Sequence, residues 1–257
     1  MSYTANMLAD SSKGFIGNRF TELPVVDSTN NYAMAKVREG QAFHGNVFFA
    51  HEQVAGKGQF GKKWEAKPGQ NITMSIVIEP FLKTANQFHL SISIACGCMD
   101  FLRKYTSAAE IKWPNDLYWQ KRKLGGILIE NIVQGEDWKT AVIGIGININ
   151  QTDFPEHLPN PVSLQQITGV RFSVIGLAKE LCSAIEIRYN QLRKGDFTPL
   201  LIYYNDNLFN KGQSVSLKQG NKVFQTKVVS VTQYGQLHTL NHLEQYFNFG
   251  EVEWLIR

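Results

Sequence analysis

The sequence lacks the features of a membrane or secreted protein. None of its apolar runs approaches the ~20 residues that a membrane-spanning helix needs. Its first ten residues contain no basic segment followed by an apolar core, so a signal peptide is not expected. Three cysteines are an odd number, which argues against a disulfide framework. Together these absences predict a protein of the reducing cytoplasm.

Metal-binding patterns and strong charge are missing as well. Cys96 and Cys98 are separated by one residue inside a predicted helix, where their side chains point to different sides. Buried thiols therefore explain them better than a metal site. The formal net charge is only +4. It permits an acidic small molecule or an acidic protein as partner and does not require nucleic acid. No internal repeat or low-complexity segment is present.

A dinucleotide-binding glycine motif is incomplete. Gly144 and Gly146 begin the pattern G-x-G-x-x-G, but Ile149 occupies its last position and no helix opens there. Dinucleotide binding is therefore disfavoured. Asn148 follows a dense apolar run, so its amide is expected to be partly buried and to need hydrogen-bond partners.

A loop rich in glycine and lysine occupies residues 56–64. It contains three glycines, three lysines and a closing tryptophan: Gly56, Lys57, Gly58, Gly61, Lys62, Lys63 and Trp64. Glycine lets a backbone come close to a ligand and lysine adds positive charge, so the loop suits a phosphate. A solvated basic hairpin explains the same composition equally well. The loop is not a P-loop, because Lys63 replaces the required Ser or Thr and Pro68 prevents a following helix.

Hydrophobic periodicity predicts the elements around this loop. Strands are expected at 20–26, 47–51, 71–78, 111–113, 117–119, 123–132 and 140–149, and helices at 31–39, 85–105, 174–194 and 197–209. The strand at 71–78 alternates apolar and polar residues, as a half-buried strand does. Thr84 and Ser173 are expected to cap the helices that follow them.

Two local features allow both a structural and a functional interpretation. Ser28 or Thr29 precedes a helix, and the spacing alone favours a helix cap over contact with a polar ligand. Gly125 and Gly126 lie within a strand. There they indicate either a β-bulge or close approach by a ligand or another backbone.

The C-terminal part of the chain has a different pattern of predicted elements. Short strands alternate with turns, at 215–217, 223–231, 236–240 and 246–249. They predict a small β-barrel or sandwich of about 45 residues. That size is at the lower limit of independent stability, so we expect it to pack on the main domain. The expected organisation is a flexible segment at 1–19, a main domain at 20–209 and a C-terminal domain at 210–257.

Five separated segments, in this order, resemble the catalytic domain of biotin protein ligases. They are 27–30 (Asp-Ser-Thr-Asn), 56–64, 112–116 (Lys-Trp-Pro-Asn-Asp), 123–127 (Lys-Leu-Gly-Gly-Ile) and 144–148 (Gly-Ile-Gly-Ile-Asn). The third and fourth are the most diagnostic, and the resemblance runs from about Phe20 to the C-terminus. It implies an α+β fold in which helices flank a mixed sheet, as in class II synthetases, with a small SH3-like β-barrel at the C-terminal end.

The resemblance implies a ligase that works in two half-reactions. Biotin and Mg·ATP give biotinyl-5′-AMP and pyrophosphate. A lysine of a biotin carboxyl carrier domain then attacks the mixed anhydride and releases AMP. The carrier domain would belong to a biotin-dependent carboxylase such as acetyl-CoA carboxylase. Because two anions meet in the first step, such a site must supply cations.

The matching positions imply roles for individual residues. Lys123, Asp116 and Lys62 would be catalytic, with Lys123 between the biotin carboxylate and the α-phosphate, and Asp116 orienting Lys123 or assisting Mg²⁺. The biotin-binding residues would be Ser28, Thr29, Asn30, Gln53, Gly56, Lys57, Gly58, Gln59, Lys123, Gly126 and Ile127. The residues around ATP and the adenylate would be Lys57, Gln59, Gly61, Lys62, Trp64, Lys112, Asn115, Lys123 and Asn148. The ligands of Mg²⁺ are not identified by the sequence.

The sequence departs from the family in two places. It has Lys57, Gln59 and Lys62 where the family usually has three arginines, and Gln59 carries no charge with which to retain the adenylate. Only 26 residues precede Asp27, fewer than the ~50 of a DNA-binding domain. A ligase without a repressor arm, which does not bind DNA, is therefore expected.

Two other functions compete with this interpretation. Lipoate–protein ligation shares the fold and the adenylate chemistry, but its usual arginine-rich glycine motif is missing here. A module that binds single-stranded nucleic acid would use the basic loop, Trp64 and the small β-domain. The oligomeric state is left open, with a homodimer as one alternative.

Overall fold

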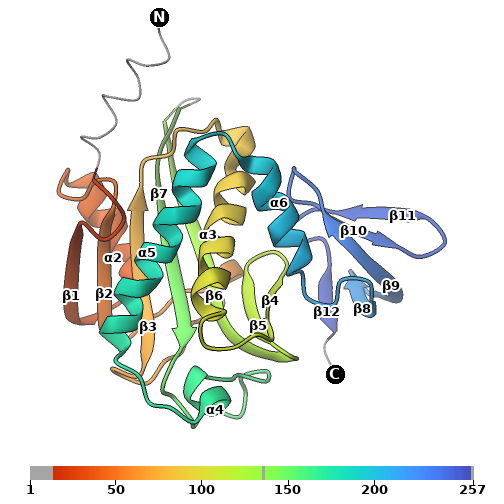
Figure 1. Ribbon diagram of the computed structural model, residues 1–257, viewed down its shortest axis with the longest axis horizontal. Helices are drawn as coiled ribbons and strands as arrows, with labels where there is room; N and C mark the ends of the chain where they lie inside the picture. Colours follow the sequence, from red (N-terminus) through yellow and green to blue (C-terminus); the bar gives the residue numbers. More distant parts are fainter. Residues whose placement is uncertain (1–13, 135–136, 256–257) are drawn as a thin grey trace, which may run out of the picture.

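Two β-sheets organise the chain. The computed structural model describes residues 14–134 and 137–255, so most of the expected flexible segment at 1–19 lies outside them (Figure 1). The larger sheet has the strand order β1-β2-β3-β7-β6-β5-β4. Its strands are β1 (Arg19–Val26), β2 (Asn46–Gln53), β3 (Asn71–Ile78), β4 (Ala109–Lys112), β5 (Asp116–Trp119), β6 (Arg122–Gln134) and β7 (Asp137–Asn148). β1 and β2 are parallel and the other neighbours are antiparallel, which confirms the predicted mixed sheet.

Helices flank this sheet on both faces. α3 (Gln87–Leu102) and α5 (Val174–Arg193) lie side by side over one face, and α2 (Thr29–Arg38) lies behind the sheet in Figure 1. Gly97 of α3 permits the close contact with α5, because a Cβ there would lie 2.7 Å from Cα of Ile185. The remaining helices are α4 (Leu164–Thr168) and α6 (Phe197–Asp206), and none of the helices in the two described ranges is long and apolar enough to cross a lipid bilayer.

The main core fills the space between the sheet and the α3–α5 pair. Met74 and Ile76 of β3 point into it, while Val77 joins a smaller apolar cluster against α2. Successive strand residues alternate between the two faces, so helices on both sides leave every residue of β3 buried. The prediction of a half-buried strand at 71–78 is therefore wrong.

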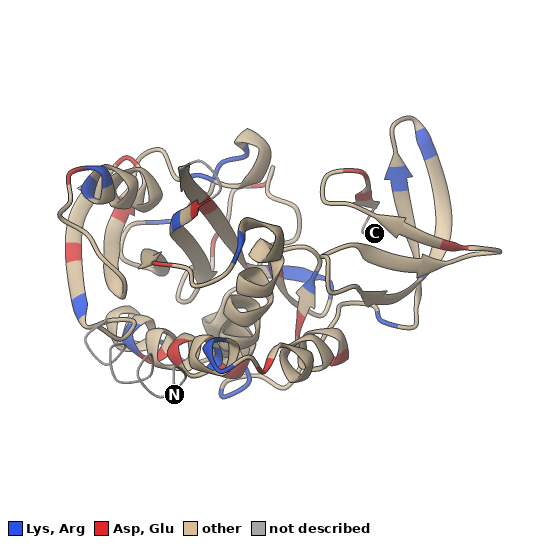
Figure 2. Ribbon diagram, turned by 90° about the horizontal axis from the view of Figure 1, so that it is seen from above, with Lys and Arg blue, Asp and Glu red and all other residues tan. Residues whose placement is uncertain are grey.

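The second sheet contains five short antiparallel strands. They are β8 (Ser214–Gln219), β9 (Lys222–Val231), β10 (Leu237–Leu240), β11 (Glu244–Phe247) and β12 (Glu253–Leu255), in the order β11-β10-β9-β8-β12. Among the described residues β11 and β12 do not pair, so the sheet is open and a closed barrel is not seen. Leu217 and Val228 join the main core. Figure 2 shows this sheet projecting from one end of the larger domain, with basic and acidic residues interspersed over both.

Several element boundaries differ from the prediction. Thr84 does not cap the long helix: it begins a short 3₁₀ turn, η3 (Thr84–Asn86), and Asn86 stands at the N-cap of α3. The short elements α4 and β12 were not predicted, since each spans too few residues to show a period. α6 ends at Asp206, and the side chain of the C-cap residue Asn207 donates to Tyr203 O at 2.7 Å. Ser173 caps α5 as expected, accepting from Gly176 N at 3.2 Å.

All three cysteines are buried and unpaired. Cys96 and Cys98 lie on α3, which confirms their interpretation as buried thiols, and Cys182 lies on α5. Burial raises the pKa of Cys96 and of Cys182 to about 12, and it also raises the pKa of Cys98.

We expect none of these thiols to react quickly with a thiol-specific disulfide reagent in the native protein at about pH 8. A raised pKa keeps the thiol protonated below that pKa, and the thiolate is the reactive form. In denaturant all three thiols should react. Counting the released chromophore per chain in both conditions checks this, and rapid reaction of a single native thiol would contradict it.

A lysine-lined pocket on one face of the sheet

One face of the larger sheet gathers the residues that the sequence singled out. Directly paired residues of neighbouring strands share a face. On the face away from α3 and α5, the register forms one row of Thr73, Gly146, Gly126 and Asp116, and a second row of Ser75, Gly144 and Leu128. Residues from β3, β7, β6 and β5 are therefore brought side by side at the end of the sheet where the loop at 56–64 follows β2.

Two glycines on this face leave space for side chains that pack directly on the sheet. A Cβ on Gly146 would overlap the ring of Trp64, and a Cβ on Gly144 would overlap the amide of Asn30. Glycine is required at both positions, because these side chains lie directly on the sheet. A Cβ on Gly125 would lie 2.6 Å from Gly146 O, so Gly125 serves close packing of two backbones rather than a ligand.

Asp116 lies between two lysines. Its Oδ1 is 2.6 Å from Lys123 Nζ, and its Oδ2 is 3.7 Å from Lys112 Nζ. The Lys123 side chain is 33% exposed and the Lys112 side chain 12%, so Lys123 is the more accessible cation of the pair. Gly126 faces this pair, with its missing Cβ position 3.3 Å from Asp116 Oδ1.

An aromatic residue of the second sheet lies near Lys112. The Lys112 ammonium lies 5.7 Å from the ring centroid of Trp254, which belongs to β12. Burial lowers the pKa of Lys112, the carboxylate of Asp116 opposes that effect, and the ammonium groups of Lys123 and Lys62 lower the pKa further. This influence of Lys62 places the loop and the Lys112–Asp116 segment in one electrostatic environment.

Asn115 and Asn148 are engaged by the protein itself. Asn148 donates to Val162 O at 3.0 Å, which holds the chain after residue 160 beside the start of β6. The side-chain amide of Asn115 donates to Ile127 O, and the backbone carbonyl of Asn115 accepts from Ile127 N at 2.9 Å. Both backbone groups of Ile127 therefore pair with Asn115, and its side chain lies in the main core. Contacts of these residues with adenine or biotin stay predictions.

A buried polar network lies beside the lysines, under the loop. Gln53 Oε1 accepts from Thr29 N at 2.7 Å and from Thr29 Oγ1 at 3.0 Å. Ser75 Oγ lies 2.8 Å from Thr29 Oγ1 and donates to Asn30 Oδ1 at 2.6 Å. Asn30 Nδ2 in turn donates to Glu130 Oε2 at 2.7 Å. The network joins α2, β2, β3 and β6 into one polar wall.

The hydroxyls at the start of α2 do not cap the helix. Ser28 stands at the N-cap, but its side chain makes no capping hydrogen bond. Thr29 is the first helical residue, and its hydroxyl is turned to Gln53. The predicted N-cap position at Ser28 is therefore confirmed, but the predicted capping role of these hydroxyls is wrong, and the Thr29 hydroxyl pairs instead with Gln53 and Ser75 of neighbouring strands.

The loop at 56–64 is a short hairpin above this face. Gly58 N donates to Lys62 O at 2.7 Å, and Trp64 N donates to Gly56 O at 3.0 Å. A cavity of about 580 Å³ lies beside it, lined by residues 55–63, residues 128–130 and Phe249. The expected loop residues from Gly56 to Lys62 thus line one cavity, whereas Trp64, Lys123 and Asp116 are not among its lining residues. β3, not a helix, follows the loop, which confirms that it is not a P-loop.

Four residues that the sequence did not single out lie in or near the site: Glu130 and Phe249 line the cavity, Ser75 belongs to the polar network, and Trp254 lies beside Lys112. Glu130 is the single charged residue between Lys123 and Ile132, and alternation along β6 places it on the face of Gly126. Lys57 Nζ lies 3.9 Å from Glu130 Oε1, so this carboxylate connects the loop to the polar network. Ser75 carried a comparable signal as a polar residue within an apolar strand. Phe249 and Trp254 carried none, because nothing in their spacing points to the distant loop.

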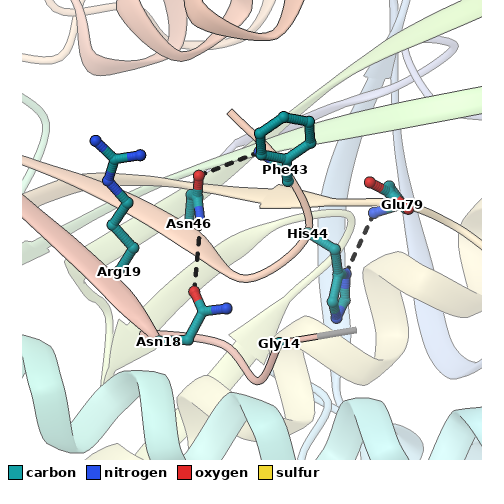
Figure 3. Close-up of a pocket in the computed structure, with 7 residues that line it drawn as sticks. All are labelled: Gly14, Asn18, Arg19, Phe43, His44, Asn46 and Glu79. Atoms are coloured by element: carbon teal, nitrogen blue, oxygen red, sulfur yellow. Dashed lines mark hydrogen bonds between the residues drawn. The ribbon is translucent and has the colours of Figure 1, made fainter. Parts of the chain in front are cut away.

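A second hollow, of about 480 Å³, lies at the opposite end of the strands (Figure 3). It is lined by Gly14, Asn18, Arg19, Phe43, His44, Asn46 and Glu79. Its polar groups largely pair with one another: Asn46 accepts from Phe43 N and donates to Asn18, and His44 accepts from Glu79 N (Figure 3). None of the predicted site residues is among these described lining residues, so the candidate site is the pocket under the loop.

The chain is similar to known proteins in sequence. Residues 22–148 match the family model described as Biotin/lipoate A/B protein ligase family. A bifunctional ligase/repressor BirA of Bacillus spizizenii is 26% identical over 86% of this chain and 69% of the relative. A biotin–[acetyl-CoA-carboxylase] ligase of Mycobacterium tuberculosis is 29% identical over 70% of this chain and 68% of the relative.

The fold has a solved counterpart. A biotin protein ligase from Aquifex aeolicus, in complex with biotin and ATP, superposes with a TM-score of 0.79 at 23% identity, over 93% of this chain and 100% of that chain. At this identity the similarity concerns the fold. The chain spans from 54% to 69% of the length of the four bifunctional ligase/repressor relatives that it matches.

Proposed function

We propose that this chain is a biotin protein ligase, because residues 22–148 match the Biotin/lipoate A/B protein ligase family. It activates biotin with ATP to biotinyl-5′-AMP and transfers biotin to a lysine of an acceptor protein. The observation that carries the proposal is the Lys123–Asp116–Lys112 cluster, which adjoins a polar network and a lysine-rich loop on one face of the sheet. This arrangement supplies cations where two anions must meet.

The first half-reaction joins the biotin carboxylate to the α-phosphate. A carboxylate oxygen attacks the α-phosphorus, the bond from that phosphorus to the bridging oxygen breaks, and pyrophosphate leaves. Lys123 can turn from Asp116 toward both reacting groups, because it is the more exposed lysine of the cluster. Lys62 of the loop adds charge on the phosphate side, and Asp116 orients Lys123.

In the second half-reaction the acceptor amine attacks the carbonyl carbon of the adenylate. A C–N bond forms, the bond to the phosphate oxygen breaks, AMP leaves with that electron pair, and the amine loses a proton. The same cations stabilise the charge that develops on the departing AMP, so one cluster serves both steps.

The two ends of the adenylate have different surroundings. The ureido ring of biotin carries N–H donors and a carbonyl acceptor, which the buried network of Thr29, Asn30 and Gln53 can pair with. Trp64 lies on Gly146 with its indole N–H buried and unpartnered, and it offers its ring to adenine. We assign Asn115 and Asn148 to the adenine edge.

Magnesium is part of the substrate Mg·ATP. Among the described residues no group of three or more His, Cys, Asp or Glu side chains could hold a metal ion. Both oxygens of Asp116 lie within 4 Å of a lysine ammonium, so we assign Asp116 to orienting Lys123 rather than to the metal. Substrate phosphates commonly supply ligands to Mg²⁺ in such sites.

We also propose a catalytic domain at 20–209 and an SH3-like domain at 210–257. The five short antiparallel strands of the second sheet support the latter. The acceptor is a biotin carboxyl carrier domain, as the name of the mycobacterial relative suggests.

Biotin-dependent ATP–pyrophosphate exchange tests the proposed function. Label from pyrophosphate should enter ATP when biotin is present and not when it is omitted or replaced by lipoate. Exchange with lipoate alone would favour lipoate ligation, and no exchange with either would overturn the proposal. Biotin with ATP should also raise the melting temperature by mass action. A rise with a single-stranded oligonucleotide instead would favour nucleic-acid binding.

The substitution Gln59→Arg is expected to slow the escape of biotinyl-5′-AMP about two- to tenfold, because a charged hydrogen bond to the phosphate replaces a neutral one. Gln59 lines the cavity under the loop. Escape is measured by a chase of labelled adenylate complex with unlabelled adenylate. Gln219→Arg, which adds the same charge in the second sheet, is the control. Equal escape from Gln59→Arg and wild type would contradict the prediction.

A further inference from the structure

The tip of the loop at 56–64 rests on the second sheet. Phe60, in the tip, stacks on Phe249, which lies in the turn between β11 and β12. Their ring centroids are 4.8 Å apart and the ring planes meet at 25°. Phe60 has a φ of 53°, in the left-handed region that favours glycine. A bulky residue in that conformation is strained, and the contact with Phe249 offsets the strain.

The turn that carries Phe249 is fixed by its own hydrogen bonds. The Glu251 carboxylate accepts from Asn248 N at 2.7 Å and from Asn248 Nδ2 at 3.0 Å. Gln236 Nε2 donates to Asn248 Oδ1 at 3.2 Å. Gly250 has a φ of 87°, and a Cβ there would lie 3.1 Å from Phe60 Cζ. The turn therefore presents the Phe249 ring in a defined place and leaves room for Phe60.

Phe249 also contacts the segment that holds the lysine cluster. Its ring meets that of Trp113 edge to face, with centroids 6.4 Å apart and planes at 84°. Trp113 is fully buried, and its Nε1 donates to Gly235 O at 2.9 Å. Phe249 thus connects the loop tip to the Lys112–Asp116 segment and forms part of the cavity wall.

We propose that Phe60 and Phe249 form an aromatic latch that holds the loop closed over the cavity, with Phe249 as a positioning residue for retention of the acyl-adenylate. The role in retention rests on the proposed function. Both rings remain partly exposed, Phe60 at 72% and Phe249 at 46%, so the contact can break without opening the core. Breaking it frees the loop for substrate binding and for access of the acceptor amine.

Limited trypsin digestion tests the latch independently of catalysis. The loop contains Lys57, Lys62 and Lys63, which become cleavable when it leaves the surface. In Phe249→Ala we expect loop cleavage to rise about two- to tenfold, the factor that one aromatic pair contributes to an equilibrium. Fragments are identified by mass spectrometry. Phe249→Tyr keeps the stacking ring and should restore the wild-type rate.

Phe81→Ala is the matched control. Phe81 is 47% exposed, and its ring centroid lies 5.9 Å from that of Tyr189. The variant therefore removes a comparable surface contact between aromatic rings. This contact lies beyond the end of β3 that is far from the loop. Phe60→Ala should reproduce the effect of Phe249→Ala, and the double variant should add nothing to either single one. Equal loop cleavage in Phe249→Ala and Phe81→Ala would overturn the latch. Phe60→Ala keeps the test available if Phe249→Ala does not fold.

Escape of biotinyl-5′-AMP provides the second readout. It should be about two- to tenfold faster from Phe249→Ala, while exchange at saturating substrates changes less. Faster loop cleavage with unchanged escape would overturn the role in retention. Failure of the proposed function would appear differently, as no biotin-dependent exchange in the wild type. The trypsin result would still decide whether the latch exists.

Discussion

Replacing Lys123 with alanine is expected to reduce biotin-dependent ATP–pyrophosphate exchange about 10²–10³-fold. Lys123 Nζ lies 2.6 Å from Asp116 Oδ1 and is the accessible ammonium of the cluster. Without this ammonium group, less of the repulsion between the biotin carboxylate and the α-phosphate is neutralised, so the barrier to their reaction rises. Lys112 still faces Asp116, so the carboxylate is not left unpaired and the fold should persist.

Lys121→Ala is the matched control for this prediction. Lys121 is exposed and lies two positions before Lys123, in the turn between β5 and β6. Its loss should leave exchange unchanged, and melting temperatures of both variants report folding. Lys123→Arg keeps the charge but changes the donor geometry, so it should recover only part of the activity. Unchanged exchange in Lys123→Ala would remove Lys123 from its proposed role.

Adding a methyl group at Gly144 is expected to weaken biotin binding about ten- to hundredfold. The new Cβ would overlap the Asn30 amide, which must then leave its hydrogen bonds to Ser75 and Glu130. Each buried polar group left without a partner costs about 1–3 kcal/mol. Titration calorimetry with biotin measures the affinity of Gly144→Ala against the wild type.

Two further variants separate this effect from general damage. Gly176→Ala adds the same methyl group on α5, where the nearest atom would be Ser173 Oγ at 3.2 Å, and it should leave biotin affinity unchanged. Ser75→Ala removes one hydroxyl without adding bulk, so its effect should be smaller than that of Gly144→Ala. Wild-type affinity in Gly144→Ala would show that the Asn30 amide does not contribute to the biotin site.

The sequence located the lysine cluster because its members are close along the chain. Lys112 and Lys123 are separated by one strand and two turns, and each turn has a polar composition that predicts it. Antiparallel pairing of β4, β5 and β6 then brings the lysines to Asp116. The resemblance to biotin protein ligases singled out these residues, and the turns between them then determine which strands are neighbours.

The polar network and the latch could not be predicted in the same way. The spacing at the start of α2 favoured a helix cap by Ser28 or Thr29, but Gln53 and Ser75 come from other strands and bind the Thr29 hydroxyl. Phe249 meets Phe60 only because the second sheet packs against the end of the larger one. Such partners depend on sheet order and domain packing, which no local pattern encodes.

The sequence by itself determined the order of most elements, because periodicity and turn composition are local properties, and its five family segments named the cations of the candidate site through a resemblance. The tertiary structure decided which face of the sheet holds the site, why Gly144 and Gly146 must lack side chains, and where the loop tip rests. These features arise from strand register and from contacts between residues far apart in the chain. They exist only once the whole chain has packed.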